Sequence, residues 1–165
     1  MKKILTVFAV IISVLVTSMA YADSGKQESK AIKAAYRQWV EAVTTAKGKP
    51  EKVLALYAPD AVLLPTLKEG PFKTREELQK YFVGFTSLKK LSAKTNKISV
   101  KVSGNIGMAS GIYTFSYIDS KGNPVSTKAR FTFVYEKIDG KWLIIKHHSS
   151  ASPESDEVDY DDDDD

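Results

Sequence analysis

Apolar and polar residues alternate along the stretch from Thr127 to Ser150. Two apolar runs in this stretch flank Asp139-Gly140, a pair that is typical of the tight turn of a β-hairpin. Strands that are apolar on both faces are usually covered on both, here by the chain's own helices and by a partner. In the first run, one face carries Ala129, Phe131, Phe133 and Tyr135. In the second run, one face carries Trp142 and Ile144, and the opposite face carries Leu143 and Ile145.

Helical spacing of apolar residues marks the first half of the chain. Between Glu28 and Ala46 these residues fall on one stripe, which predicts an amphipathic α-helix. Pro50 is well placed to open a short second helix, which Ala58-Pro59-Asp60 would end. Thr74 and Glu77 form a T-x-x-E capping box, which predicts the start of a third helix.

Further strands are predicted between and after the helices. A brief strand covers residues 61–65, and two longer alternating runs cover residues 91–102 and 106–118 before the hairpin. The order is therefore helix, helix, short strand, helix and then four strands joined as a meander. This order predicts an α+β fold in which a curved antiparallel sheet wraps around three N-terminal helices.

The start of the chain has the three parts of a secretory signal peptide. Lys2 and Lys3 form a basic end, residues 4–16 form an apolar core, and small residues precede a predicted cut before Asp23. The alternative is a membrane anchor, but polar residues interrupt the span of about 20 apolar residues that an anchor needs. The sequence predicts a signal peptide over residues 1–22 and a bacterial protein that is exported, periplasmic or secreted, without stable membrane insertion after cleavage.

The charge of the chain is divided unevenly along its length. Removing Lys2 and Lys3 leaves 22 of the 24 basic residues, and nine of the 20 acidic residues lie after Ser152. Residues 23–152 therefore hold 22 basic and 11 acidic side chains and form the predicted domain. Its lysines are scattered, with no aromatic platform, so no nucleic-acid partner is predicted. Residues 153–165 are predicted to form a disordered acidic tail.

Three stretches resemble a known superfamily. They are LYAPDAVLLP at residues 56–65, EGPFKTREELQKYF at residues 69–82 and RFTFVYEKIDGKWLIIKHHSS at residues 130–150. With the aromatic pair Tyr36 and Trp39 on the first helix, they resemble the SnoaL-like, NTF2-like superfamily. Within it the chain is most similar to small exported bacterial relatives of the calcium/calmodulin-dependent protein kinase II association domain, over about residues 28–153.

This resemblance implies a cone in which a curved sheet wraps helices around a pocket, with assembly through the outer face of the sheet. Some relatives are isomerases, cyclases or hydrolases, and others only bind ligands or assemble, so the fold alone does not assign the function. The chain has no cysteine, which excludes thiol chemistry. The adjacent His147 and His148 point to opposite faces of a strand and cannot readily hold one metal ion, so neither a metal nor another cofactor is predicted.

Candidate chemistry is sparse. No two acidic residues are placed together at mid-strand, so no catalytic residue is assigned. One of His147 and His148, with His148 as the candidate, either lines the mouth of the pocket or is a structural histidine at a strand end. Arg130 either reaches a carboxylate-binding site or is solvated. Ser149 stands where the resemblance implies an arginine of an anionic pocket. The aromatic candidates, as core residues or as pocket walls, are Tyr36, Trp39, Tyr113 and Trp142.

Two functions follow from these observations. The first is a non-catalytic exported domain that forms a homodimer or a larger ring and binds a small molecule, an anionic one included. The alternative is a SnoaL-like isomerase, cyclase or hydrolase that uses His148, Arg130 or a pocket tyrosine. A cavity that holds His148 and Arg130 within reach of each other would favour the enzyme. A cavity filled by aromatic side chains would favour assembly alone.

Overall fold

The structure is a computed structural model, which describes residues 25–66 and 68–153. The predicted signal peptide over residues 1–22, Leu67 of the turn after the short strand, and residues 154–165 of the predicted tail lie outside this part. A helix covers residues 25–45. It is followed by α2 (Glu51–Leu54), β1 (Tyr57–Leu64), α3 (Arg75–Thr86), β2 (Lys89–Ser103), β3 (Ile106–Ile118), β4 (Pro124–Ile138) and β5 (Lys141–Ala151).

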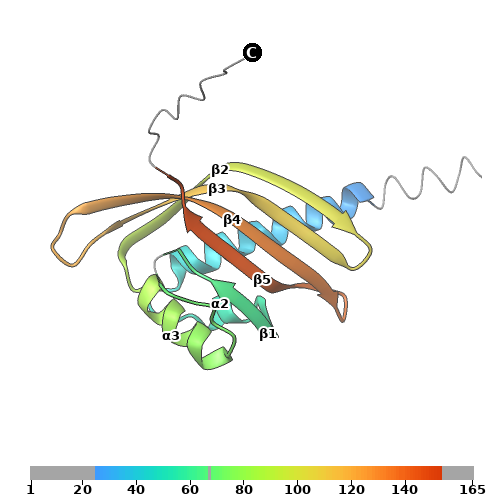
Figure 1. The fold of residues 1–165 in the computed structure, drawn as a ribbon, viewed down its shortest axis with the longest axis horizontal. Helices are drawn as coiled ribbons and strands as arrows, with labels where there is room; N and C mark the ends of the chain where they lie inside the picture. The colour runs from blue at the N-terminus through green and yellow to red at the C-terminus, as the bar shows by residue number, and fades with distance from the viewer. Residues whose placement is uncertain (1–24, 67, 154–165) are drawn as a thin grey trace, which may run out of the picture.

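The strands form one sheet in the order β1-β5-β4-β3-β2. Strand β1 is parallel to β5, and the other neighbours are antiparallel. The helix over residues 25–45 lies across one face of the curved sheet, and α2 and α3 lie near β1 (Figure 1). This is the α+β arrangement that the sequence predicts. No helix in the described part of the chain is both long and apolar enough to span a membrane.

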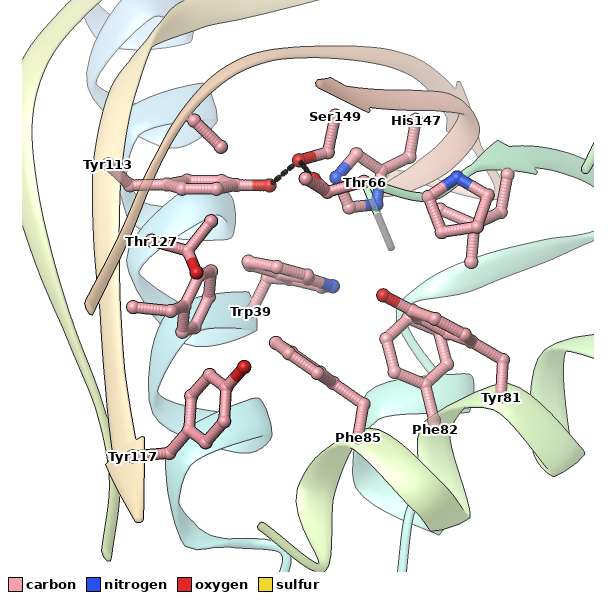
Figure 2. Close-up of a pocket in the computed structure, with 14 residues that line it drawn as sticks. Trp39, Thr66, Tyr81, Phe82, Phe85, Tyr113, Tyr117, Thr127, His147 and Ser149 are labelled. Atoms are coloured by element: carbon pink, nitrogen blue, oxygen red, sulfur yellow. Dashed lines mark hydrogen bonds between the residues drawn. The ribbon is translucent and has the colours of Figure 1, made fainter. Parts of the chain in front are cut away.

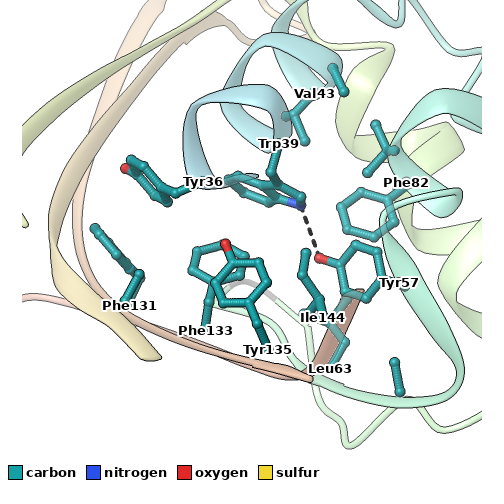
Figure 3. Close-up of a cluster of buried hydrophobic side chains, with 14 of the residues drawn as sticks. Tyr36, Trp39, Val43, Tyr57, Leu63, Phe82, Phe131, Phe133, Tyr135 and Ile144 are labelled. Atoms are coloured by element: carbon teal, nitrogen blue, oxygen red, sulfur yellow. Dashed lines mark hydrogen bonds between the residues drawn. The ribbon is translucent and has the colours of Figure 1, made fainter. Parts of the chain in front are cut away.

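The first helix buries the stripe that its spacing predicts. Ile32, Tyr36, Trp39 and Val43 are each at most 2% exposed, and the rings of Tyr36 and Trp39 face those of β4. The ring of Tyr36 stacks on Phe131 at 4.9 Å between centroids, and other aromatic rings of β4 complete the layer (Figure 3). Burial of a large apolar side chain contributes roughly 1.5–3 kcal/mol, so this layer is a main source of stability.

Two predicted local signals are confirmed. Asp139 and Gly140 both have positive φ, 48° and 77°, as a two-residue hairpin turn with right-handed strand twist requires. At the start of α3, the Glu77 backbone N–H donates to Thr74 Oγ1 at 3.2 Å. The Thr74 N–H donates in return to Glu77 Oε2 at 2.9 Å. Each signal involves neighbouring residues only, which is why the sequence alone reveals it.

Strand β1 begins earlier than the sequence predicts. Residues 58–60 were expected to end a helix, but β1 runs from Tyr57 to Leu64, and α2 already ends at Leu54. The N–H of Ile144 on β5 donates to the Leu56 carbonyl at 2.8 Å, so pairing with a distant strand decides the conformation. Pro59 is tolerated because β1 is an edge strand, where a missing N–H leaves no ladder bond unmade.

Strand β5 contains a bulge that reverses the direction of its later side chains. Val134 pairs with Lys146 while Tyr135 pairs with Ile144, so Ile145 is an extra residue opposite β4. Regular alternation from Ile144 would turn the Lys146 ammonium toward the core, where an unpaired charge is costly. With the bulge, Lys146 is exposed.

Candidate ligand cavity

A small cavity lies between the first helix, α3 and the inner face of the sheet (Figure 2). Its volume of about 30 Å³ accommodates about two water-sized groups. Most of the surrounding space is filled by aromatic side chains. The lining residues are Trp39, Leu63, Pro65, Thr66, Tyr81, Phe82, Phe85, Tyr113, Phe115, Tyr117, Thr127, Ala129, His147 and Ser149.

Helix α3 forms one wall of the cavity. Tyr81, Phe82 and Phe85 project from it toward Trp39 (Figure 2). Phe82 is fully buried, whereas Tyr81 and Phe85 are only half-buried and stack on each other at 5.8 Å between centroids. On the opposite side, Tyr117 of β3 is also half-buried. The partly exposed rings therefore mark the mouth of the cavity, and the fully buried ones mark its floor.

His147 is fixed by a buried chain of hydrogen bonds. Trp39 Nε1–H donates to the Tyr57 hydroxyl at 3.0 Å, and that hydroxyl lies 2.8 Å from His147 Nδ1. The imidazole also stacks on Phe133 at 3.9 Å between ring centroids. These contacts hold the ring from two sides. His147 Nε2 is buried and has no hydrogen-bond partner among residues 25–66 and 68–153.

A second polar group lies beside His147. The Tyr113 hydroxyl donates to Ser149 Oγ at 2.6 Å (Figure 2). Ser149 Oγ in turn contacts the Thr66 hydroxyl. Hydroxyl groups can act as donor or acceptor by rotation, so this cluster can adapt to either kind of ligand atom.

The cavity is electrically neutral. None of the described residues that line it is an aspartate, glutamate, lysine or arginine. Burial, with a smaller effect of His148, lowers the pKa of His147 to about 3, so its imidazole is uncharged at neutral pH. Burial also raises the pKa of Tyr81 and Tyr113. At neutral pH these groups can form hydrogen bonds, but none is poised to gain or lose a proton.

The family model of the calcium/calmodulin dependent protein kinase II association domain matches residues 27–153. The chain belongs to this family. A structure from Xanthomonas campestris, provisionally assigned to the same association domain, is 44% identical with a TM-score of 0.68. That match covers 74% of this chain and 86% of the other. A search of curated proteins finds no significant match.

Two more distant structures share the fold of this association domain. An NTF2-like superfamily protein from Salmonella enterica is 20% identical over 84% of this chain and 98% of its own, with a TM-score of 0.68. A protein from Novosphingobium aromaticivorans, provisionally assigned as a scytalone dehydratase, is 14% identical over 80% of this chain and 89% of its own, with a TM-score of 0.71. The curved sheet wrapped around helices is thus the NTF2-like cone, as the sequence predicts.

The predicted aromatic residues of the association domain occupy three kinds of position. Trp39 and Tyr113 line the cavity. Tyr36 is buried in the adjoining core, where its hydroxyl lies 3.0 Å from Thr95 Oγ1. Trp142 lies at the other end of the first helix, where its Nε1–H donates to a carboxylate oxygen of Glu28 at 3.1 Å. That carboxylate also pairs with Lys137 at 2.7 Å, so Trp142 helps attach the helix to the hairpin.

The structure does not bring His148 and Arg130 into the cavity. Both are exposed on the outer face of the sheet, where the register pairs His148 with Thr132 and Arg130 with Ser150. Arg130 lies there because its neighbours in the strand face inward, and His148 because the bulge shifts the alternation. The expectation that either residue lines the pocket is therefore wrong for this structure. Within the described residues, no group of three or more His, Cys, Asp and Glu side chains is placed to hold a metal ion.

Of the lining residues, the sequence does not single out Thr66 and considers His147 only as the neighbour of His148. Tyr57, which holds His147 from outside the lining, is also missed. The signal for His147 lies in Lys146, because an uninterrupted strand that buries Ile144 also buries this lysine. A bulge between Ile144 and Lys146 keeps the lysine out of the core, and it turns His147 inward. Tyr57 has no such signal, since its place depends on the pairing of β1 with β5.

Proposed function

We propose that this association domain joins copies of itself through the outer face of its sheet and holds a small molecule in its cone without transforming it. The family to which the chain belongs is named for association. The outer face is the side that the chain's own first helix leaves open (Figure 1). A second copy is the occupant that we propose for it.

The observation that carries the proposal is a group of apolar side chains on this outer face. Ile106 and Met108 of β3 are 38% and 39% exposed. The strand register pairs Met108 with Val134. It pairs Glu136 of β4 with Ile106 on one side and with Leu143 on the other, so these side chains lie in one row across the sheet. Neighbouring apolar side chains that remain open to water are typical of a surface that a partner covers.

The composition of the cavity supports binding over catalysis. An isomerase or hydrolase needs a group that exchanges protons near neutral pH. The buried imidazole of His147, with its pKa near 3, and tyrosines with raised pKa values do not meet that need. The similarity to the protein assigned as a dehydratase concerns the fold alone, because identity is 14%.

A pair of matched substitutions tests the proposed contact. Met108→Lys adds a positive charge to the outer face beside Lys101, its partner on β2, whereas Val83→Lys places one at a similarly exposed site on α3, 41% exposed. We expect sedimentation velocity to show that Met108→Lys weakens self-association at least tenfold, because the contact would bury a further like charge. Val83→Lys should leave it unchanged. Equal behaviour of the two variants would exclude this face as the contact.

The outer face also carries several basic side chains, which gives the same experiment a second readout. Lys97, Lys101, Arg130 and Lys146 are exposed on it, and two copies that meet there bring like charges together. Salt screens such repulsion. Self-association of the unmodified protein should therefore strengthen as ionic strength rises, and a marked weakening would argue against this face.

We also propose that residues 1–22 direct export and are removed before Asp23. Support comes from the basic start, the apolar core and the small residues before the cut. The mass of the subunit tests this proposal. A mass that corresponds to the chain from Met1 would overturn it.

A further inference from the structure

We infer that the cavity selects uncharged molecules that carry a hydrogen-bond acceptor, such as a carbonyl oxygen, and that His147 Nε2–H donates to this atom. The inference rests on the ligand-binding part of the proposed function and specifies the class of ligand. The sequence allowed an anionic ligand, whereas the structure leads us to infer a neutral one. Three features of the cavity carry it: a free donor, the lack of countercharge and an aromatic mouth.

The hydrogen-bond chain determines which nitrogen of His147 carries the proton. The Tyr57 hydroxyl already accepts from Trp39 Nε1–H, and among the described residues its other partner is His147 Nδ1, so we assign the hydroxyl hydrogen to a bond with Nδ1. A neutral imidazole has one N–H, so the proton is then on Nε2. That N–H is buried and has no acceptor in the described part of the chain. A buried donor without a partner favours a ligand that supplies an acceptor.

The same surroundings disfavour an anion. His147 is 3% exposed, stacks on Phe133 and contacts Trp39 edge to face, so a positive charge on its ring is poorly stabilised. None of the described lining residues is a lysine or an arginine. A carboxylate in the cavity would lose its hydration and gain no opposite charge. A ketone or amide oxygen loses far less hydration for the same hydrogen bond.

The shape of the cavity indicates a flat ligand. The inner space of about 30 Å³ holds only a small polar group. Beyond it lie the half-buried rings of Tyr81, Phe85 and Tyr117 (Figure 2). Aromatic rings bind flat apolar groups by stacking and edge-to-face contact. The geometry points to an aromatic carbonyl compound with its oxygen toward His147 and its ring at the mouth.

Acetophenone and benzoate form a matched pair of probes, because they have nearly the same shape and differ in charge. The mature protein, labelled with ¹⁵N in its histidines, is observed by NMR at neutral pH. We expect His147 to carry its proton on Nε2 and that nitrogen to shift when acetophenone is added. Benzoate should leave it unchanged. A proton on Nδ1, or benzoate binding as strong as that of acetophenone, would overturn the inference.

Two variants locate the effect at His147. His147→Phe keeps an aromatic ring against Phe133 and removes the donor, so affinity for acetophenone should fall about tenfold. His148→Gln alters only the exposed neighbour and should bind as the unmodified protein does. Equal affinity in both variants contradicts the inference. Should His147→Phe fail to fold, the NMR experiment on the unmodified protein still decides the matter.

The outcomes also separate this inference from the proposed function. Binding of benzoate alone would overturn the ligand class and leave a ligand-binding cone in place. Binding of neither probe would overturn both the ligand class and the ligand-binding part of the proposed function. Self-association is measured independently, through Met108 on the outer face.

Discussion

His147 owes both its orientation and its charge state to its immediate neighbours. The Tyr57 hydroxyl fixes Nδ1, and Phe133 and Trp39 enclose the ring with apolar surface. Protonating His147 in the folded protein would place a charge among these apolar groups. Burial opposes this charge and lowers the pKa of His147 to about 3. In the unfolded chain the same imidazole titrates near 6.5.

This difference predicts a pH dependence of stability. Between pH 6.5 and about 3 the unfolded chain binds a proton at His147 and the folded chain does not. The stabilisation is therefore complete above pH 6.5, and the free energy of unfolding falls by roughly 1.4 kcal/mol for each pH unit below it. Urea unfolding at a series of pH values measures this slope.

Substitution separates the contribution of His147 from that of the carboxylates, which are common to all variants. His147→Phe should flatten the slope between pH 6 and 4, and His148→Gln, at an exposed site, should retain it. Parallel curves for the unmodified protein and His147→Phe would show that this histidine is not buried in the neutral form.

At the scale of single residues, the sequence identified the right surroundings and the wrong histidine. Trp39 and Tyr113 could be proposed as pocket walls because helical and strand periodicity place them on inner faces. His148 was favoured over His147, although regular alternation was the only guide to which of them faces inward. One extra residue, Ile145, exchanges the two positions. Local spacing does not reveal such a bulge unless the charge of Lys146 is considered.

Among the elements, the first helix and β3 approach each other closely at a glycine. A Cβ on Gly107 would lie 2.3 Å from the terminal carbon of Ile32, a fully buried side chain of the helix. Gly111 serves a similar purpose between β3 and β2, since its Cβ would lie 2.0 Å from the Lys97 carbonyl oxygen. These glycines let the sheet curve closely around the helix.

Two alanine substitutions should have opposite effects. Gly107→Ala forces Ile32 or the helix to move and should lower the free energy of unfolding by about 1–3 kcal/mol. Gly84 lies within α3 with open space around it, so Gly84→Ala should raise the free energy of unfolding by about 0.5–1 kcal/mol. Chemical denaturation of both variants checks the pair. Equal stability of the two would contradict the close packing of helix and sheet.

Elements set by short-range signals could be predicted, and those set by distant contacts could not. The amphipathic stripe of the first helix, the Thr74–Glu77 box and the Asp139-Gly140 turn each depend on residues a few positions apart. The start of β1 depends on β5, which lies far along the chain. The stop signal Ala58-Pro59-Asp60 placed Tyr57 within the predicted second helix, and strand pairing overrode that signal.

At the scale of the whole molecule, the sheet separates two surfaces with different roles. Its inner face carries the aromatic layer and the neutral cavity beside His147. Its outer face carries Met108 and Ile106 among lysines and Arg130. We assign ligand binding to the first surface and self-association to the second. The sequence could predict this division, because alternation along β3 and β4 sorts the residues between the two faces.

Native mass spectrometry of the protein purified from the cells that produce it tests this account most directly, because one spectrum reports the subunit mass, the number of subunits and any retained molecule. We predict subunits that begin at Asp23, assembled as a dimer or a larger ring, with additional mass that is lost on denaturation and belongs to an uncharged carbonyl compound. A single subunit without added mass would contradict the account.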